Sequence, residues 1–281
     1  MIAIKMTILV MNFVHLMKLI SINTGFISIN VNDLFTSLTG KIPDLYIPRD
    51  ADDHVRCSVC SLLIRSAARN VIMDTGVGTL MDQGILDHYN YRSLGDWTTL
   101  LEPYDLLPSD ITDVILTHLH FDHCGGAVRS APDLGSREEV VLTFPNAIHW
   151  ISRVQWEWAQ NITEREPDSF FEHTFLSIGK HNRLNLVEKE SEIIPGIKVR
   201  LFNGHTRGLM IPIITSENET IVFAGDLIPT HIHLHPEIGM SYDLDPELVR
   251  REKEVLIGEA KNNRWKLILQ HDPSREIVHS F

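Results

Sequence analysis

Residues 117–123 read Thr-His-Leu-His-Phe-Asp-His and directly follow the apolar run DVIL, which is typical of a buried strand. His118 and His120 are two positions apart, so they point the same way where the strand continues and can hold one ion. Asp122 and His123 follow as the chain turns, and they can face a second ion. Zinc binds imidazole nitrogen and carboxylate oxygen, and catalytic zinc keeps one position open for water. The heptapeptide therefore predicts a catalytic metal centre at a strand end.

Two metal ions need more ligands than this heptapeptide supplies, and three further candidates occur in similar surroundings. His205 lies in FNGHT, Asp226 in FAGD and His271 in LILQH. Each of these side chains follows an apolar, strand-like run, and the first two stand directly after a glycine. The combination predicts that polar groups from several strand ends meet at one centre.

The rest of the chain alternates between strand-like and helix-like patterns. The expected strands are Ser58–Arg65, Asn70–Asp74, Asp113–Thr117, Lys198–Phe202, Leu209–Thr215, Thr220–Ala224 and, as the last one, Trp265–Leu269. The first two are joined by a short polar turn and predict a hairpin. The expected helices are Asn146–Gln160, from its apolar spacing, and Asp245 to about Asn262, from its acidic N-cap and proline. No Pro/Gly/Ser-rich linker divides the chain, so we expect one α/β domain in which helices cover β-sheets.

Composition excludes several classes of protein. The chain has 281 residues and a formal net charge of −12, whereas nucleic-acid-binding proteins need a positive field. The apolar segment Met1–Ile20 resembles a weak signal peptide, but it lacks an A-x-A-like cleavage site. It is interrupted by Asn12, His15 and Lys18, and it is too short to span a membrane. We expect residues 1–16 to be an appendage or a misassigned start and residues 17–281 to form the domain. A cytoplasmic protein without nucleic-acid or membrane partners is predicted.

Three cysteines, Cys57, Cys60 and Cys124, are too few for a disulfide framework. Cys57 and Cys60 form a CxxC that resembles a redox or metal pair. They lie in CSVCSLLI, however, which predicts a strand, and residues three apart on a strand point to opposite faces. The strand interpretation is therefore favoured over the redox one.

Five short segments, in this order along the chain, resemble the motifs of the metallo-β-lactamase superfamily. They are IMDTG (72–76), HLHFDH (118–123), NGHT (203–206), FAGD (223–226) and LQHD (269–272). The resemblance spans roughly Ile20 to Pro273. It implies an αββα four-layer sandwich with the metal site at one edge of the two β-sheets.

The resemblance also implies a set of ligands for two divalent metal ions, expected to be zinc. His118, His120 and His205 would bind the first ion, and Asp122, His123 and His271 the second, with Asp226 bridging both. Asp74 would support the ligand loop without binding metal.

Within the superfamily, the chain resembles the branch of lactonases and related ester or phosphotriester hydrolases. His120 stands where the di-iron, oxygen-reducing branch has glutamate, and β-lactam-cleaving members lack a bridging carboxylate such as Asp226. Acyl-homoserine lactonases have a tyrosine three residues after the bridging aspartate, where this chain has Pro229. Tyr242 is a candidate to reach the same space from the following loop.

The expected function is hydrolysis of a lactone, ester or phosphotriester of a small, apolar substrate. A metal-bridging hydroxide would attack the substrate, and Asp122 would shuttle a proton. The alternatives are a mononuclear-metal thioester hydrolase similar to glyoxalase II, a sulfur dioxygenase-like enzyme, and a non-catalytic scaffold. A small-molecule substrate is the expected partner, and homodimer formation is left open.

Other histidines and aromatic residues have simpler interpretations. His231, His233 and His235 imitate the HxH pattern, but no further ligand completes it, so a loop surface or a substrate contact is favoured. Trp150, Trp156 and Trp158 are spaced for packing along a helix. Phe144, Trp150 and Trp156 are also candidates for the apolar wall of a substrate pocket. The apolar wall would suit a hydrophobic acyl or aryl group.

Overall fold

The computed structural model describes residues 17–40, 48–131, 136–161, 166, 168–217, 219–273 and 278–280. The expectation for residues 1–16 lies outside this part of the chain. Met17 directly precedes the first strand, β1 (Lys18–Asn30).

Two large β-sheets form the centre of the described fold. The first has seven strands in the order β10 (Leu184–Val187), β9 (Ile148–Ser152), β6 (Asp113–Ile115), β4 (Asn70–Met73), β3 (His54–Arg65), β1 and β5 (Arg92–Ser93). The second has six strands in the order β11 (Ser191–Ile194), β12 (Ile197–Phe202), β13 (Leu209–Ser216), β14 (Glu219–Phe223), β16 (Lys266–Ile268) and β17 (Val278–Ser280). Two small ribbons pair β2 (Thr36–Ser37) with β15 (Ile238–Gly239), and β7 (Val128–Ala131) with β8 (Ser136–Leu142).

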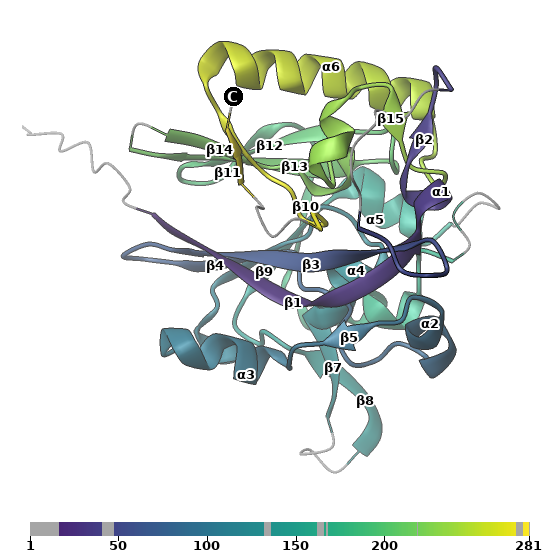
Figure 1. Cartoon of the computed structure of the whole chain (residues 1–281). Coiled ribbons are helices and arrows are strands. Elements are labelled where there is room, and N and C mark those ends of the chain that lie inside the picture. Colours follow the sequence, from purple (N-terminus) through teal and green to yellow (C-terminus); the bar gives the residue numbers. More distant parts are fainter. Residues whose placement is uncertain are drawn as a thin grey trace, which may run out of the picture.

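The helices lie outside the two sheets. The described α-helices are α1 (Val31–Leu34), α2 (Gln83–His88), α3 (Trp97–Leu101), α4 (Phe121–Cys124), α5 (Arg153–Ala159) and α6 (Pro246–Asn263). Figure 1 shows α6 above the second sheet and α3 below the first sheet. One buried cluster joins the second sheet to α6, and another joins the first sheet to α3 and α5. The layers therefore run helix, sheet, sheet, helix, and the predicted αββα sandwich is confirmed.

Alternation along the strands explains why each sheet has two buried faces. Leu62 and Ile64 of β3 belong to the buried cluster between the two sheets. Leu63 belongs to the cluster between the first sheet and its covering helices, α3 and α5. Met73 and Ile72 of β4 divide in the same way. Successive side chains of a strand point to opposite faces, so a continuous apolar run suits a strand that is covered on both sides.

Most of the expected elements are present, and their ends follow from local chemistry. β3 and β4 form the predicted antiparallel hairpin. Asp245 caps α6 by accepting a hydrogen bond from Leu248 N, with Pro246 in the first turn. The helix ends at Asn263, one residue beyond the expected end.

Two expectations about elements were wrong. Ile148–Ser152 is the strand β9, and only Arg153–Ala159 is helical, so the helix expected over the whole of residues 146–160 is half as long. β9 pairs with β6 on one side and β10 on the other, and these long-range backbone hydrogen bonds outweigh the local helical spacing. The strand expected to be the last, now β16, is followed by the antiparallel strand β17.

The strand interpretation of the CxxC is confirmed. Cys57 and Cys60 are both buried, free thiols of β3, and Cys57 packs in an apolar cluster with Val55 and Val59. Burial raises the pKa of both thiols, so they remain protonated and poorly nucleophilic at neutral pH. Among the described residues, no helix is long and apolar enough to cross a membrane.

Candidate metal centre

The ligand loop follows β6 and is held in place by one buried carboxylate. Asp74, at the end of β4, adopts a left-handed backbone conformation with φ of 51°. Its carboxylate accepts hydrogen bonds from Thr117 N and Thr117 Oγ1, both at 2.8 Å, and from His123 Nδ1 at 2.9 Å. Asp74 therefore supports both ends of the heptapeptide, as the family resemblance implied.

Asp122 and His123 lie on the short helix α4, and His120 is its N-cap residue. Gly125 and Gly126 follow α4 directly, and a Cβ at either position would collide with the backbone of Thr75 or Val77. Two backbone segments thus approach closely here, which requires residues without a side chain. This close approach fixes the position of α4 relative to the end of β4.

The three remaining candidates follow strands of the second sheet. His205 lies after β12, Asp226 lies in the short 3-10 helix after β14, and His271 lies after β16. β14 and β16 are parallel, as are β4 and β6, so their carboxyl ends lie at one edge of each sheet. All seven predicted ligands are buried and come together at this edge.

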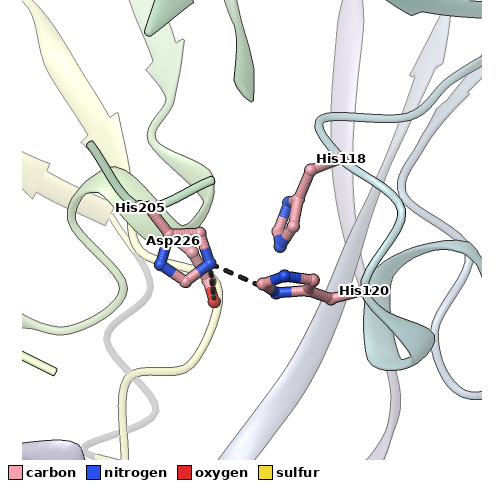
Figure 2. A group of neighbouring side chains, drawn as sticks. All are labelled: His118, His120, His205 and Asp226. Carbon is pink, nitrogen blue, oxygen red and sulfur yellow. Dashed lines mark hydrogen bonds and ion pairs between the residues drawn. The ribbon is translucent and has the colours of Figure 1, made fainter. Parts of the chain in front are cut away.

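The seven side chains form two groups with their ligand atoms within 4.8 Å of one another in each. The first group contains His118, His120, His205 and Asp226, which point toward one another in Figure 2. The second group contains Asp122, His123 and His271.

Asp226 lies between the two groups. Its Oδ2 atom is 3.4 Å from His205 Nε2 in the first group. Its Oδ1 atom is 3.2 Å from His271 Nε2 and 3.4 Å from His123 Nε2 in the second group. One carboxylate oxygen thus faces each group, which is the arrangement of a bridging ligand.

The spacing of the donor atoms fits a tetrahedral cation. His205 Nε2 and His120 Nδ1 are 3.3 Å apart, and so are His271 Nε2 and His123 Nε2. Two nitrogens bound to one zinc ion at about 2.0–2.1 Å in tetrahedral geometry are separated by about 3.3–3.4 Å. His118 Nε2 is buried and has no hydrogen-bond partner among the described residues. A buried nitrogen without a partner is costly unless a ligand satisfies it.

Hydrogen bonds from the outer ring nitrogens orient the histidines. His205 Nδ1 donates to Asp243 Oδ1 at 2.9 Å, and His271 Nδ1 donates to the Ser58 carbonyl at 2.8 Å. His120 Nε2 donates to Glu166 Oε1 at 3.2 Å, so this ring presents Nδ1 inward.

The two remaining histidines are oriented in the same way. His123 donates from Nδ1 to Asp74, and His118 Nδ1 lies 3.0 Å from Thr117 Oγ1. With the outer nitrogens donating, every inward nitrogen has a lone pair for a metal ion.

Sequence reasoning identified Asp74 as a supporting residue but missed Asp243 and Glu166. Asp243 is 38 residues from His205, and Glu166 is 46 residues from His120. Neither carboxylate lies in a recognisable motif, so no local signal pointed to them.

Burial and charge oppose each other within the centre. Burial lowers the pKa of His118 well below its usual value, which keeps this imidazole neutral. Burial also opposes protonation of His123, but Asp122 and Asp226 outweigh it and hold its pKa well above the usual value. The pKa of Asp226 is held well below its usual value by His123 and His271, against the effect of burial. A cation that binds here therefore replaces protons as the partner of these carboxylates.

We expect Asp243→Asn to weaken metal binding about 10- to 100-fold, because an outer carboxylate raises the basicity of its histidine and fixes its orientation. Competition with a chromophoric chelator would measure the affinity. The exposed Asp52 offers a matched control, and Asp52→Asn should bind metal as the wild type does. Unchanged affinity in Asp243→Asn would show that the 2.9 Å bond to His205 has no part in metal binding.

A cavity of about 200 Å³ opens beside both groups. His120, Asp122, Asp226 and His271 line it, so it gives access to the centre. Tyr242 lines it as well, with its ring centroid 6.2 Å from that of His205. Pro229 is also part of the lining.

The aromatic residues expected to line the pocket lie elsewhere, and that expectation was wrong. Phe144 is buried against Trp97, and Trp156 packs on Phe175. Trp150 lies on β9 and donates a hydrogen bond to Asp113 Oδ1. The packing interpretation of Trp156 and Trp158 agrees with the structure, because both pack against the buried cluster that joins the first sheet to α3 and α5.

The HIHLH segment does not join the metal groups. His233 is buried, donates to the Leu34 carbonyl and accepts from Thr230 Oγ1 at 2.8 Å. His231 is paired with Asp272 at 2.8 Å. Among the described residues, neither belongs to a group that could hold a metal ion.

Comparison with known proteins agrees with this geometry. The family model of the metallo-β-lactamase superfamily matches residues 55–271. An N-acyl homoserine lactonase of Bacillus cereus is 27% identical over 165 residues, covering 57% of each chain. One of Bacillus thuringiensis is 25% identical over 174 residues, covering 60% of this chain and 59% of the relative. The chain thus spans less than two thirds of the length of these curated relatives.

Solved structures resemble the chain over more of its length. A probable metal-dependent hydrolase from Staphylococcus aureus superposes with a TM-score of 0.80 at 25% identity, covering 91% of this chain and 89% of that one. The dizinc quorum-quenching lactonase AidC superposes with a TM-score of 0.74 at 21% identity, covering 95% and 94%.

The chain thus combines an αββα sandwich with two buried His/Asp groups that could hold metal ions at one edge of its sheets. The chain belongs to the metallo-β-lactamase superfamily.

Proposed function

We propose that the protein hydrolyses a lactone, ester or phosphotriester of a small, apolar substrate with the help of two divalent metal ions, expected to be zinc. His118, His120 and His205 would hold the first ion, Asp122, His123 and His271 would hold the second, and Asp226 would contribute to both sites. The observation that carries the proposal is the position of Asp226, which presents one oxygen to each group at 3.2–3.4 Å. The lactonase names of the relatives support the substrate class.

When bound, two divalent ions supply Lewis acidity and lower the pKa of a shared water. The side chains of the centre do the rest. Asp122 lines the cavity and is 12% exposed, so it can receive a proton from the attacking water and pass it on. The outer hydrogen bonds keep the histidines from turning as charge develops during the reaction.

Tyr242 can supply a proton to the leaving oxygen. Burial, and next the charge of Asp226, raises the pKa of Tyr242 well above its usual value, so the phenol stays protonated at neutral pH. Its hydroxyl has no hydrogen-bond partner among the described residues, and its side chain lines the cavity. Tyr242 thus reaches the cavity from the segment after β15, whereas Pro229 stands three residues after Asp226.

We expect Tyr242→Phe to lower kcat about 10- to 100-fold without changing the metal content, because it removes a hydrogen-bond donor but no metal ligand. The measurements are steady-state kinetics and metal analysis of the same preparation. Tyr104 is a partly buried tyrosine that does not line this cavity, and Tyr104→Phe is the matched control. A normal kcat in Tyr242→Phe would assign the proton to another donor.

A substrate panel and metal analysis together test the proposed function. We expect about two divalent ions per chain and measurable cleavage of a lactone or an aryl ester, with weak or no action on β-lactams and RNA. The ratios of kcat/KM across lactones, thioesters, aryl esters and phosphotriesters report discrimination in the transition state. Strong preference for a glutathione thioester, or oxygen consumption with a persulfide and one iron per chain, would favour the mononuclear alternatives instead.

A further inference from the structure

The lining of the cavity beside the metal centre separates into apolar and acidic parts. Ile27, Ile29, Leu34 and Met240 line it and belong to one buried apolar cluster. Glu166 and Asp168 supply the acidic part. The volume of about 200 Å³ is smaller than the roughly 300–1,000 Å³ of pockets for drug-sized ligands, so the buried part of the substrate is small.

The two carboxylates differ in what they do. Glu166 is buried, and both of its oxygens already accept hydrogen bonds, from His120 Nε2 and from Trp158 Nε1 at 2.7 Å. Asp168 is exposed, and it makes no ion pair with any Lys, Arg or His that the structure describes. The charge of Asp168 nevertheless affects a residue that lines the cavity. Burial, followed by the charges of Asp122 and Asp168, raises the pKa of Tyr89, another lining residue, to about 12.

The charged residues that line the cavity disfavour the binding of an anionic group. Four carboxylates line the cavity (Asp122, Glu166, Asp168 and Asp226), and none of the described lining residues is Lys or Arg. Two divalent ions would cancel these four charges. Asp74 and Asp243, directly behind the histidines, add further negative charge. An anionic substituent away from the reacting carbonyl would therefore enter a negative potential without a cation to pair with it.

We propose that Asp168 selects the substrate by charge, so that the site accepts uncharged or cationic esters and lactones with a small apolar acyl group and rejects anionic ones. The inference rests on the proposed hydrolytic function and specifies its substrate class. The apolar cluster receives the acyl group, and Asp168 faces the part of the substrate that remains near the solvent. The same selection disfavours glutathione thioesters, because glutathione carries two carboxylates.

Three esters with the same small apolar acyl group and alcohol portions of the same length test this selection. Their alcohol portions end in a trimethylammonium group, its uncharged tert-butyl isostere, or a carboxylate. We expect kcat/KM for the cationic ester to exceed that for the anionic ester by about tenfold or more with the metal-loaded protein. Because the cause is an interaction between partly exposed charges, about 1 M salt should narrow this ratio.

The variant Asp168→Asn should reduce the cationic-to-anionic ratio by about fivefold or more, as expected for removal of one unit charge near the substrate. Glu102 is an exposed carboxylate that does not line the cavity, and Glu102→Gln should keep the wild-type ratio. A ratio near one in the wild type, or an unchanged ratio in Asp168→Asn, would overturn the inference.

Binding separates this inference from the proposed function. Ketone analogues of the three esters, with a methylene in place of the ester oxygen, cannot be hydrolysed, and calorimetry gives their affinities for the metal-loaded protein. Cleavage of none of the esters would refute the proposed function. Tighter binding of the cationic ketone would still support charge selection in that case, and equal binding of all three would refute it.

Discussion

Asp226→Ala is expected to lower kcat/KM by more than about 10³-fold, which corresponds to the loss of roughly 4 kcal/mol of transition-state stabilisation. Asp226 is the residue that faces both groups, with Oδ2 toward His205 and Oδ1 toward His123 and His271. Its removal takes a ligand from each ion and leaves the two cations to repel each other. Both metal affinities should therefore fall together, as measured by titration of the apoprotein.

Two comparisons make this prediction specific. Asp122→Ala should chiefly loosen the second ion and slow the reaction, because Asp122 belongs to one group only. Asp52→Ala, at an exposed position, should leave both affinities unchanged. Retention of two tightly bound ions and a near-normal rate in Asp226→Ala would show that the dinuclear assignment is wrong.

Removal of the metal ions is the second change with a large expected effect. Chelation should abolish hydrolysis, and addition of about two equivalents of divalent ion per chain should restore it. A ligand that binds only the folded state at 1,000 times its Kd stabilises that state by about 4 kcal/mol, and two such ions by about 8 kcal/mol, so the melting temperature of the apoprotein should be lower by about 15 °C. Elemental analysis, activity and thermal unfolding of the same samples would measure the three effects.

Histidine variants separate the ligands from the other histidines. His118→Ala should empty the first site, because His118 Nε2 has no described partner other than the expected ion. His231→Ala should keep the full metal content, since His231 is paired with Asp272 outside both groups. A preparation that is active after all metal has been removed would refute the central proposal.

Features that depend on neighbours along the chain could be predicted from the sequence. The heptapeptide 117–123 combines four candidate ligands with a strand end, and the structure brings all four into the two groups. The cap of α6 at Asp245 and the hairpin of β3 and β4 also follow from residues close in sequence. His205, Asp226 and His271 were predicted because each lies shortly after an apolar, strand-like run, which is again a local signal.

Features that depend on distant neighbours required the tertiary structure. β9 has an apolar spacing that is compatible with a helix, and only its pairing between β6 and β10 made it a strand. Phe144, which precedes β9, and Trp150, which lies on it, were expected to line the pocket but belong to the packing of the sheets. Short apolar runs are compatible with both helix and strand. Their periodicity indicates which side chains are buried, but it does not indicate which segment they pack or pair with.

The surroundings of the metal centre show most clearly which features the sequence determined and which required the tertiary structure. The candidate ligands could be predicted from the sequence, because zinc chemistry restricts ligands to a few residue types at short spacing. The roles of Asp243 and Glu166 were not, since they hold His205 and His120 across separations of 38 and 46 residues. The cavity wall is likewise assembled from β1, α1 and the segment after β15. Which side chains meet across such distances depends on how the two sheets and their helices pack, and local periodicity contains no information about that packing.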